Sequence, residues 1–599
     1  MNEHHNSQSH GKLGLMGSVS YRVFDMLLSP VVIIFCCYFL APAVFGMPPE
    51  DPIQCSGSGC VLSNSYGSWL DRQDCKVSKV AYPTTEQELV SLVAEASKNS
   101  LKVKAVSSFA HTIPKLACPD QTPNSLLIST SKYNSNIEVD VANLVVTADA
   151  GVGLRQLIDR VEEENLSLVA SPYWEGVSIG GLISTGSHGS SWWGKGGSVH
   201  DHVVGLNLVV PATASEGYAK VLKLQDCGDP LFKAAKVSLG LLGVISKVKL
   251  SLEPGFKRSI AFNFTDDSSF ENEFSDHAKR HEFADITWYP SRKTAVYRYD
   301  DRVSLNAEGD GINDFLGFQS NSVLVSKGVR FTEKELEKAK SVKGKCGVAA
   351  TELGYKKFIA NGLKNNKILF TGYPVVGRQG KMQTSGSCLY TPNWRKDVSC
   401  AWDPRIEGLF FYESTAIFPA SKFINFIRDV KKLRDLNPDN FCGLDLYNGI
   451  LIRFIKASDA YLGQSEDSVV IDFNYYRADD AVTPRLNQDV WEEIEQLAFF
   501  KYGAKPHWAK NRNSAFLNVQ HKYQNYNKFM AAKQQLDPHN LFSSWFSDNL
   551  LLGKALNKTD GCALEGQCIC SEDKHCSPGD GYLCKAGLVY TDARVCRSS

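Results

Sequence analysis

A stretch of glycine, serine and threonine between Glu175 and Trp193 is the part of the chain best suited to contact a ligand. It reads EGVSIGGLISTGSHGSSWW. Glycine permits close approach and positive φ, and small hydroxyl groups add hydrogen-bond donors without bulk. The spacing is neither that of the P-loop nor GxGxxG, which excludes the usual nucleotide motifs. We therefore expect backbone N–H groups of this stretch to face a phosphate, with an ordinary turn as the alternative.

Two other segments accompany this stretch. Upstream, KVKAVSSFAHTIPKLAC (Lys102 to Cys118) places His111 in a turn of small residues after a strand, and downstream VSLGLLGVISKVKL (Val237 to Leu250) forms a second glycine-bearing segment. The three segments, in this order, resemble the FAD-binding domain of the vanillyl-alcohol oxidase superfamily. Within it the chain is most similar to the aldonolactone oxidases, the plant L-gulono-1,4-lactone oxidases in particular, from about Val77 to Leu550.

The resemblance implies FAD as the cofactor. It assigns flavin contacts to residues of all three segments: Ser107, Ser108, Phe109, Ala110, His111, Thr112, Ser178, Gly180, Gly181, Ser184, Thr185, Gly186, His188, Gly189, Gly243, Val244 and Ile245. In several related oxidases the histidine matching His111 is bonded to the flavin, and Cys118 follows it at the spacing seen in the animal enzyme. Relatives place glycines before this histidine, so both covalent attachment and a structural role remain open. His188 either contacts the flavin or caps its own loop.

The resemblance also implies three catalytic residues in the second half of the chain: Arg453, His507 and Lys510. Arg453 matches the arginine of a Glu-x-Arg pattern, but Leu451 stands where the glutamate is expected. Lys510 ends KPHWAK and would stabilise negative charge on the reduced flavin near N1. The alternatives are a structural ion pair for Arg453 and core packing for His507. No residue is an evident general base, and we expect no metal.

The activity implied is oxidation of L-gulono-1,4-lactone, or a close aldonolactone, to L-ascorbate with oxygen as acceptor and hydrogen peroxide as product. Leu451 keeps open an oxidase of another sugar, alditol or oligosaccharide. A non-catalytic secreted carbohydrate-binding protein on a flavin fold is the alternative from another class. The formal charge of zero and pI near 7.1 offer no basic stripe for nucleic acid, so the expected partner is a small molecule.

The N-terminus reads as a targeting segment, and the cysteines indicate an oxidising compartment. Residues 1–46 resemble a signal peptide, with an uncleaved anchor as the alternative and no stable membrane span expected. Seventeen cysteines include six in the last forty residues. These six favour a disulfide-linked module over a zinc site, so we expect the protein to enter the secretory pathway and to be secreted. The sequons at Asn165, Asn263 and Asn557 are compatible with export. The resemblance ends before the module, so we expect the module to be dispensable for flavin chemistry.

The elements that would position these residues define an α+β protein. We expect an FAD-binding domain of the PCMH type with two subdomains (76–255), a substrate domain with a large antiparallel sheet (256–550) and a Cys-rich tail (560–599). Lys76 to Val106 reads as a βαβ unit, and helices are expected near 154–164, 423–433 and 488–500. Long strands are expected in AVYRYDDRV, ILIRFIKAS and SVVIDFNYYR. The charged stretch 308–347 gives no clear assignment.

Overall fold

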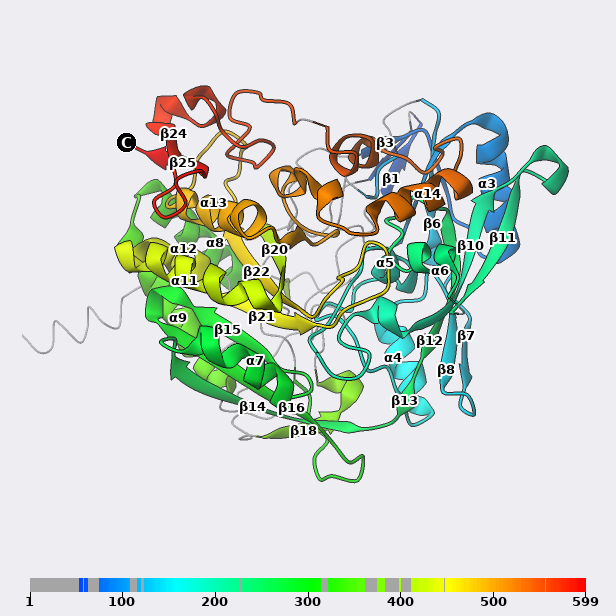
Figure 1. Cartoon of the computed structure of the whole chain (residues 1–599), viewed down its shortest axis with the longest axis horizontal. Coiled ribbons are helices and arrows are strands. Elements are labelled where there is room, and N and C mark those ends of the chain that lie inside the picture. The colour runs from blue at the N-terminus through cyan, green and yellow to red at the C-terminus, as the bar shows by residue number, and fades with distance from the viewer. Residues whose placement is uncertain are drawn as a thin grey trace, which may run out of the picture.

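Two sheets of different character divide the chain, as the computed structural model shows (Figure 1). It describes residues 53–57, 59–62, 75–107, 116–119, 123–226, 228–313, 321–360, 374–382, 398–399, 411–446, 448–554 and 556–599. This mixture of helix and sheet, with a large antiparallel sheet and a disulfide-rich C-terminus, confirms the expected α+β class. Within these residues, no helix has the length and apolar character needed to cross a membrane.

The predicted βαβ unit is present. Strands β4 (Lys79–Ala81) and β5 (Lys102–Val106) both pair in parallel with β6 (Ser125–Ser129), and α3 (Glu86–Asn99) connects the first two. Thr85 caps α3, because its hydroxyl accepts the N–H of Glu88 at 3.1 Å. The buried side chains of Leu89, Val93 and Ala96 lie on one face of the helix.

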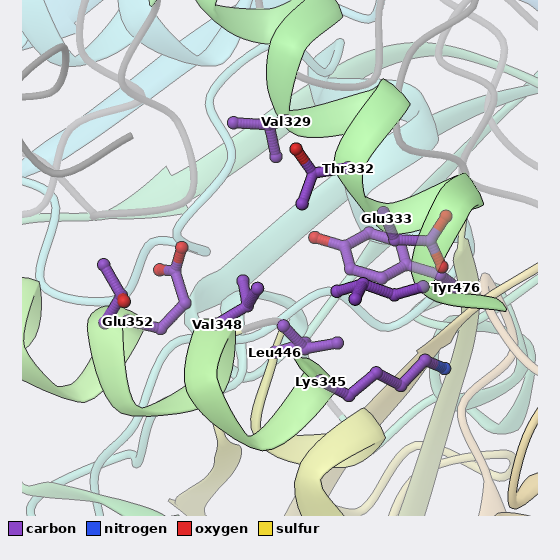
Figure 2. Close-up of a pocket in the computed structure, with 10 residues that line it drawn as sticks. Val329, Thr332, Glu333, Lys345, Val348, Glu352, Leu446 and Tyr476 are labelled. Atoms are coloured by element: carbon purple, nitrogen blue, oxygen red, sulfur yellow. The ribbon is translucent and has the colours of Figure 1, made fainter. Parts of the chain in front are cut away.

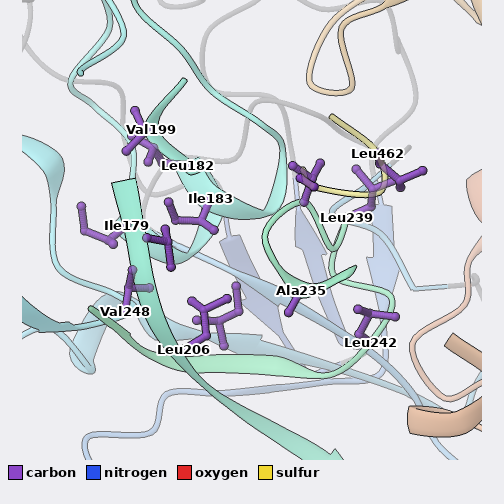
Figure 3. Close-up of a cluster of buried hydrophobic side chains, with 14 of the residues drawn as sticks. Ile179, Leu182, Ile183, Val199, Leu206, Ala235, Leu239, Leu242, Val248 and Leu462 are labelled. Atoms are coloured by element: carbon purple, nitrogen blue, oxygen red, sulfur yellow. The ribbon is translucent and has the colours of Figure 1, made fainter. Parts of the chain in front are cut away.

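A five-stranded sheet forms the other half of the first domain, in the order β11-β10-β12-β8-β7. Its strands are β7 (Ile137–Asp140), β8 (Val145–Asp149), β10 (Val203–Pro211), β11 (Ala219–Gln225) and β12 (Val244–Ser251). Helices α4 (Leu154–Glu163), α5 (Ile179–Ser184) and α6 (Pro230–Ala235) belong to this half. Figure 3 shows apolar side chains of α5, including Ile179, Leu182 and Ile183, packed beside those of β10 and β12. This core fixes the glycine-rich stretch against the sheet.

The second sheet is antiparallel and has eight strands, in the order β18-β14-β16-β15-β21-β22-β20-β23. They are β14 (Lys257–Asp266), β15 (Asp285–Tyr289), β16 (Thr294–Val303), β18 (Val375–Arg378), β20 (Phe411–Pro419), β21 (Ile450–Ile455), β22 (Ser468–Tyr476) and β23 (Lys505–Pro506). Side chains alternate between its two faces. One face is apolar and joins the core that also contains residues of α7 (Phe270–Arg280), α11 (Ala420–Leu436) and α13 (Gln488–Gln496).

Most elements expected from the pattern are found in place, and one stretch without an assignment is helical. The predicted helices near 423–433 and 488–500 are α11 and α13, the second continuing as a π-helical turn over Leu497–Lys501. The unassigned stretch contains α8 (Val323–Lys338) and the start of α9 (Val342–Ala360). A disulfide between Cys346 and Cys442 ties α9 to α12 (Cys442–Asp445). Propensity did not reveal α9 because its apolar residues do not form one clear stripe.

The end of the chain returns to the first domain before it reaches the tail. Helix α14 (Tyr526–Leu536) and the turn Phe546–Leu551 contribute Phe529, Phe546 and Leu551 to the core around α5 and β12. In Figure 1 α14 lies beside α6, whereas the last strands, β24 (Tyr582–Ala586) and β25 (Arg594–Ser598), lie beside α13. The segment between His507 and Leu551 therefore connects both sheets.

Disulfides pair all six cysteines of the tail. The pairs are Cys562–Cys568, Cys570–Cys584 and Cys576–Cys596. This confirms the disulfide interpretation, because the cysteines close enough to share a metal ion are already bonded to sulfur. Cys118, expected at the family spacing, pairs with Cys75. The predicted signal peptide, 1–46, lies outside the described residues.

Candidate active site

The face of the large sheet opposite α7, α11 and α13 carries polar side chains. Thr415, Asp472, Leu451 and Thr287 form one row across β20, β22, β21 and β15, because each is the register partner of the next. Arg453 lies two residues beyond Leu451 and therefore on the same face. Phe454, the next residue of β21, lies on the opposite face, in the apolar core beneath the helices.

Arg453 and Lys510 share one carboxylate. Arg453 Nη2 forms an ion pair with Asp472 Oδ2, and Lys510 Nζ lies 3.0 Å from Asp472 Oδ1. The hydroxyl of Thr415 also donates to Asp472 Oδ1. Lys510 Nζ bonds a second carboxylate, Glu413 Oε1, at 2.6 Å. The structure thus brings together two of the three predicted catalytic residues and gives both a structural ion pair.

The two carboxyl groups around Lys510 have pKa values shifted in opposite directions. Burial alone would raise the pKa of Asp472, but the charges of Arg453 and Lys510 outweigh burial and hold it well below its usual range. Burial raises the pKa of Glu413, with only partial opposition from Lys510. Asp472 is therefore a fixed anion, whereas Glu413 takes up a proton more readily than an ordinary glutamate.

His188 and His507 lie next to this cluster. Their ring centroids are 5.3 Å apart. His188 Nδ1 donates to Gly189 O at 2.9 Å, so its Nε2 is the unprotonated nitrogen. His507 Nδ1 accepts the N–H of Ala509 at 3.1 Å, so its proton resides on Nε2. Arg453 Nη1 reaches His188 O at 3.3 Å and links the histidines to the charged cluster.

Both imidazoles are neutral over the physiological range. Burial, followed by the charge of Arg453, lowers the pKa of His188 to about 3. Burial and the neighbouring His188 hold the pKa of His507 well below 6.5. The pair therefore offers one acceptor and one donor at fixed positions and no positive charge.

The glycine-rich stretch differs from the expectation in one respect. Eight of its N–H groups donate to carbonyl groups of the chain, namely those of residues 179, 180, 182, 185, 186, 187, 189 and 191. Ser184 Oγ and Thr185 Oγ1 likewise donate to Gly180 O and Gly181 O, at 2.8 and 3.0 Å. The expectation that N–H groups face a phosphate is wrong for these positions, because they bond carbonyls within α5 and the turn after it or carbonyls of other segments, those of Val152, Ala150, Gly197 and Phe454. Contact with the cofactor through other atoms stays a prediction.

Two of the predicted glycines are required by packing within the protein. A Cβ at Gly189 would lie 2.5 Å from Ser171 O, and one at Gly243 would lie 2.6 Å from Val209 O. Val244 and Ile245 begin β12, and Ser107 follows β5. Ser108, Phe109, Ala110, His111 and Thr112 lie outside the described residues.

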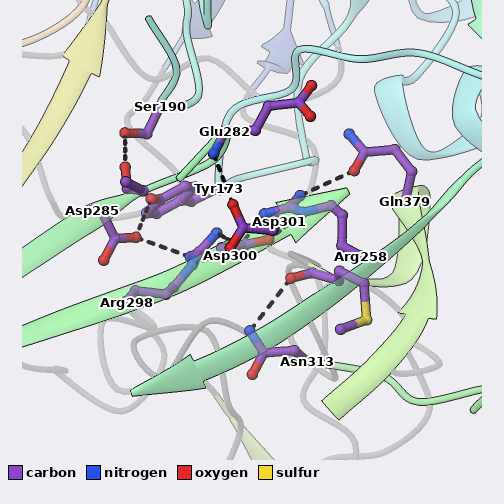
Figure 4. Close-up of polar contacts among 12 residues, drawn as sticks. Tyr173, Ser190, Arg258, Glu282, Asp285, Arg298, Asp300, Asp301, Asn313 and Gln379 are labelled. Atoms are coloured by element: carbon purple, nitrogen blue, oxygen red, sulfur yellow. Dashed lines mark hydrogen bonds and ion pairs between the residues drawn. The ribbon is translucent and has the colours of Figure 1, made fainter. Parts of the chain in front are cut away.

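Sequence reasoning missed four residues that contact Arg453 or Lys510 or each other in the cluster, Tyr173, Glu413, Thr415 and Asp472. It also missed Asn474, which lies opposite Glu413 on the same face of the sheet. Asp472 and Asn474 interrupt an otherwise apolar strand with a period of two, which is the signal that could have placed them on one face. Tyr173 places its ring 5.1 Å from the guanidinium of Arg453 and donates its hydroxyl to Asp285. Figure 4 shows this bond and the adjoining ion pairs. Arg298 pairs with both Asp285 and Asp300, and Arg258 pairs with Asp300.

Several buried polar atoms around the cluster have no hydrogen-bond partner among the described residues: His188 Nε2, Arg453 Nε and Asn474 Oδ1. Buried polar atoms are normally paired, so such a group indicates a place where a bound molecule supplies the partner. The sheet face, with two cations and two neutral imidazoles, suits a flavin together with a polyhydroxy substrate. FAD therefore fits the residues that are present.

A separate cavity lies between α8, α9 and the end of β22 (Figure 2). Its volume is about 30 Å³, enough for water but too small for a sugar lactone. Burial lowers the pKa of Lys345 to about 7 and raises that of Glu352 to about 7. None of its lining residues belongs to the cluster around Asp472, so this cavity is not the substrate site.

The fold and this cluster define a two-domain flavin-binding oxidoreductase. Residues 77–214 match the family described as FAD binding domain, residues 411–550 match D-arabinono-1,4-lactone oxidase, and residues 559–598 match the C-terminal domain described as L-gulonolactone oxidase 2-like. A solved structure, a solvent-stable cholesterol oxidase, shares the fold with a TM-score of 0.62 at 18% identity, over 84% of this chain and 99% of that one.

Full-length relatives identify the family. L-gulonolactone oxidase 3 of Arabidopsis thaliana is 63% identical over 93% of this chain and 95% of its own length. L-gulonolactone oxidase 5 of the same plant is 45% identical over 94% and 96%, and the Bos taurus enzyme is 25% identical over 80% and 96%. The chain belongs to the plant L-gulonolactone oxidase family, as the resemblance predicts. The match at 559–598 corrects the expectation that the likeness ends before the Cys-rich tail.

Proposed function

We propose that the protein oxidises the C2 hydroxyl of L-gulono-1,4-lactone, giving L-ascorbate after tautomerisation, with oxygen reduced to hydrogen peroxide. The observation that carries the proposal is the arrangement of Arg453 and Lys510 on one carboxylate beside two neutral histidines. The names of the plant relatives and the lactone-oxidase match over 411–550 support the choice of an aldonolactone.

The chemistry that FAD supplies when bound is acceptance of a hydride from the C2 carbon and return of the electron pair to oxygen. Arg453 and Lys510 provide fixed positive charge near the place where negative charge develops. His507 Nε2 donates a hydrogen bond to the ligand, and the unpartnered His188 Nε2 accepts one. The hydroxyl proton and the hydride together reduce one oxygen molecule to one hydrogen peroxide, so atoms and electrons balance.

Leu451 favours a second candidate, oxidation of a different sugar, alditol or oligosaccharide. A leucine cannot bind the substrate hydroxyl that a glutamate at this position would hold. The carboxylate of Asp472 faces the same row of the sheet but is occupied by Arg453, Lys510 and Thr415. A different pattern of hydroxyl groups in the substrate would suit this arrangement.

A substrate panel tests both candidates. Purified full-length protein is mixed anaerobically with aldonolactones, alditols and free sugars, and loss of the flavin absorption bands is followed. Bleaching by L-gulono-1,4-lactone, with peroxide formed when air is admitted, is the expected result. Bleaching only by an alditol or sugar would select the second candidate, and a colourless protein that takes up no FAD would favour a carbohydrate-binding role.

We also propose that the protein enters the secretory pathway and carries N-linked glycans. Disulfides join twelve of the described cysteines, which is typical of an oxidising compartment. The asparagines of the sequons, Asn165, Asn263 and Asn557, are all exposed. An endoglycosidase shift of the purified protein, together with its presence outside the cytosol, is expected. A protein that shows no shift and stays in the cytosol would contradict the proposal.

A further inference from the structure

The C-terminal disulfide module is bound to the substrate domain on two sides. On the first side it contacts α13. The carboxylate of Glu493, fully buried, accepts the backbone N–H groups of residues 588, 589 and 590 at 2.6 to 2.8 Å. Gln496 bonds both the N–H and the carbonyl of Arg594, at 3.0 and 2.7 Å.

On the second side, the module binds the chain directly after Lys510. The N–H of Ser514 donates to Gly566 O at 2.9 Å. Arg512 Nη1 donates to Leu564 O at 3.3 Å, and the amide of Asn513 donates to the side chain of Gln567. One turn of the module thus contacts three residues of the segment that follows His507 and Lys510.

Arg512 is the centre of this second contact. It is buried, and its Nη2 lies 2.5 Å from Glu495 Oε2 while its guanidinium lies 4.1 Å from the ring centroid of Trp491. Gly566 has φ of 63°, and a Cβ there would lie 2.3 Å from Arg512 Nε. The glycine of the module therefore permits the close approach on which the position of this arginine depends.

A continuous series of hydrogen bonds leads from Arg512 to the site. The second oxygen of Glu495 accepts the hydroxyl of Ser414 at 2.8 Å. Ser414 Oγ in turn accepts from the Asn511 amide at 3.1 Å, and Asn511 Oδ1 accepts the N–H of His507 at 3.0 Å. Ser414 lies between Glu413 and Thr415, which contact Lys510 and Asp472. The series runs through buried side chains and ends on the backbone N–H of His507.

In place of the expectation that the module is dispensable for flavin chemistry, we propose that the C-terminal module positions the His507–Lys510 segment, with Arg512 and Glu495 as the positioning residues that transmit its contact. A buried ion pair is costly unless its geometry is fixed and its other hydrogen bonds are made. Here the module supplies the carbonyl of Leu564 and the turn at Gly566 that fix Arg512. The effect on the reaction rests on the proposed function, whereas the effect on the segment does not.

The test compares two arginines at the contact between the module and the substrate domain. Arg512, outside the module, pairs with Glu495 of α13 and donates to the module at Leu564 O. Arg597, inside the module, pairs with Asp489 and Glu493 of α13. Arg512→Gln removes the contact that leads to the site, and Arg597→Gln removes the 2.6 Å pair with Asp489, which lies away from it. Hydrogen exchange is followed for 505–514 and for the module strands 582–598 in full-length protein with FAD bound. Arg512→Gln should speed exchange at 505–514 about tenfold or more while the module strands keep their protection. Arg597→Gln should leave 505–514 unchanged.

The reaction gives the second measurement. Arg512→Gln should lower the anaerobic flavin reduction rate by about tenfold at saturating substrate, with a smaller change in substrate dissociation, and Arg512→Lys should restore part of it. If Arg512→Gln does not fold, two other variants replace it in both measurements. One is the double variant Arg512→Gln with Glu495→Gln, which leaves no unpaired charge, and the other is the milder Gln567→Ala. Equal exchange at 505–514 in the Arg512 and Arg597 variants would overturn the proposal. Failure of every lactone to reduce the flavin would instead refute the proposed function. The hydrogen-exchange result would then decide whether the module positions the His507–Lys510 segment.

Discussion

Leu451 and Asp472 lie directly opposite each other on neighbouring strands, and Asp472 binds the arginine two residues from Leu451. The resemblance to aldonolactone oxidases places a glutamate at position 451. In this chain the carboxylate beside Arg453 comes from the adjacent strand instead. The charge at the site is thereby retained, but the carboxylate is already bound by Arg453, Lys510 and Thr415.

Restoring the glutamate should therefore destabilise the protein. Leu451→Glu would add a third carboxylate to the cluster, about 5 Å from Asp472 measured between Cβ atoms. We expect a loss of roughly 1–3 kcal/mol in unfolding free energy at pH 8. The loss should shrink at pH 5, because protonation removes the repulsion. Denaturant unfolding at both pH values measures it, with Leu451→Gln as the uncharged control; equal losses for Glu and Gln at both pH values would show that repulsion is not the cause.

Glu413 should make stability depend on pH. Burial raises its pKa above the usual 4.5, so the folded state binds this proton more tightly than the unfolded state. The stabilisation is fully present below 4.5 and is lost as pH rises through the raised pKa. The glutamine of Glu413→Gln cannot ionise. The unfolding free energy of this variant minus that of the parent protein should therefore be larger at pH 8 than at pH 4. A difference in unfolding free energy that is the same at both pH values would contradict this assignment.

The sequence predicted elements better than the contacts of the site. Helix α11 and strands β21 and β22 follow from periodicity, because each buries one continuous apolar set. Asp472 could not be paired with Arg453 and Lys510 from the sequence, because strand register and a loop about forty residues away decide the contact. The expectation that N–H groups around Gly180 face a phosphate is wrong, since composition does not reveal that the segment after β8 supplies their acceptors, Ala150 O for Gly180 and Val152 O for Ile179.

His111 is predicted to carry the flavin covalently, on the resemblance of its segment to that of related oxidases. Acid precipitation of the parent protein should leave the yellow colour in the pellet, and His111→Ala should release it into the supernatant. Released flavin is measured by its absorbance after the pellet is removed. If the parent protein itself releases its flavin in acid, the linkage does not exist and His111 has another role.

Lys510 should matter more for flavin reduction than for substrate affinity. A cation already in place where negative charge develops stabilises the transition state more than the ground state. Lys510→Met keeps the length of the side chain and removes the charge. The anaerobic reduction rate at saturating lactone should fall by roughly 10²–10³, while the substrate dissociation constant changes little.

The ion pairs of Lys510 require one further variant. Its loss leaves Asp472 and Glu413 facing the site without the cation between them, which would also slow the arrival of negative charge. Lys510→Met combined with Glu413→Gln removes the second of these charges. If the missing cation is the main cause, the double variant should remain as slow as Lys510→Met. A double variant that regains most of the parent rate would show that Lys510 acts by neutralising Glu413, and a weaker dissociation constant with an unchanged rate would make it a substrate-binding residue.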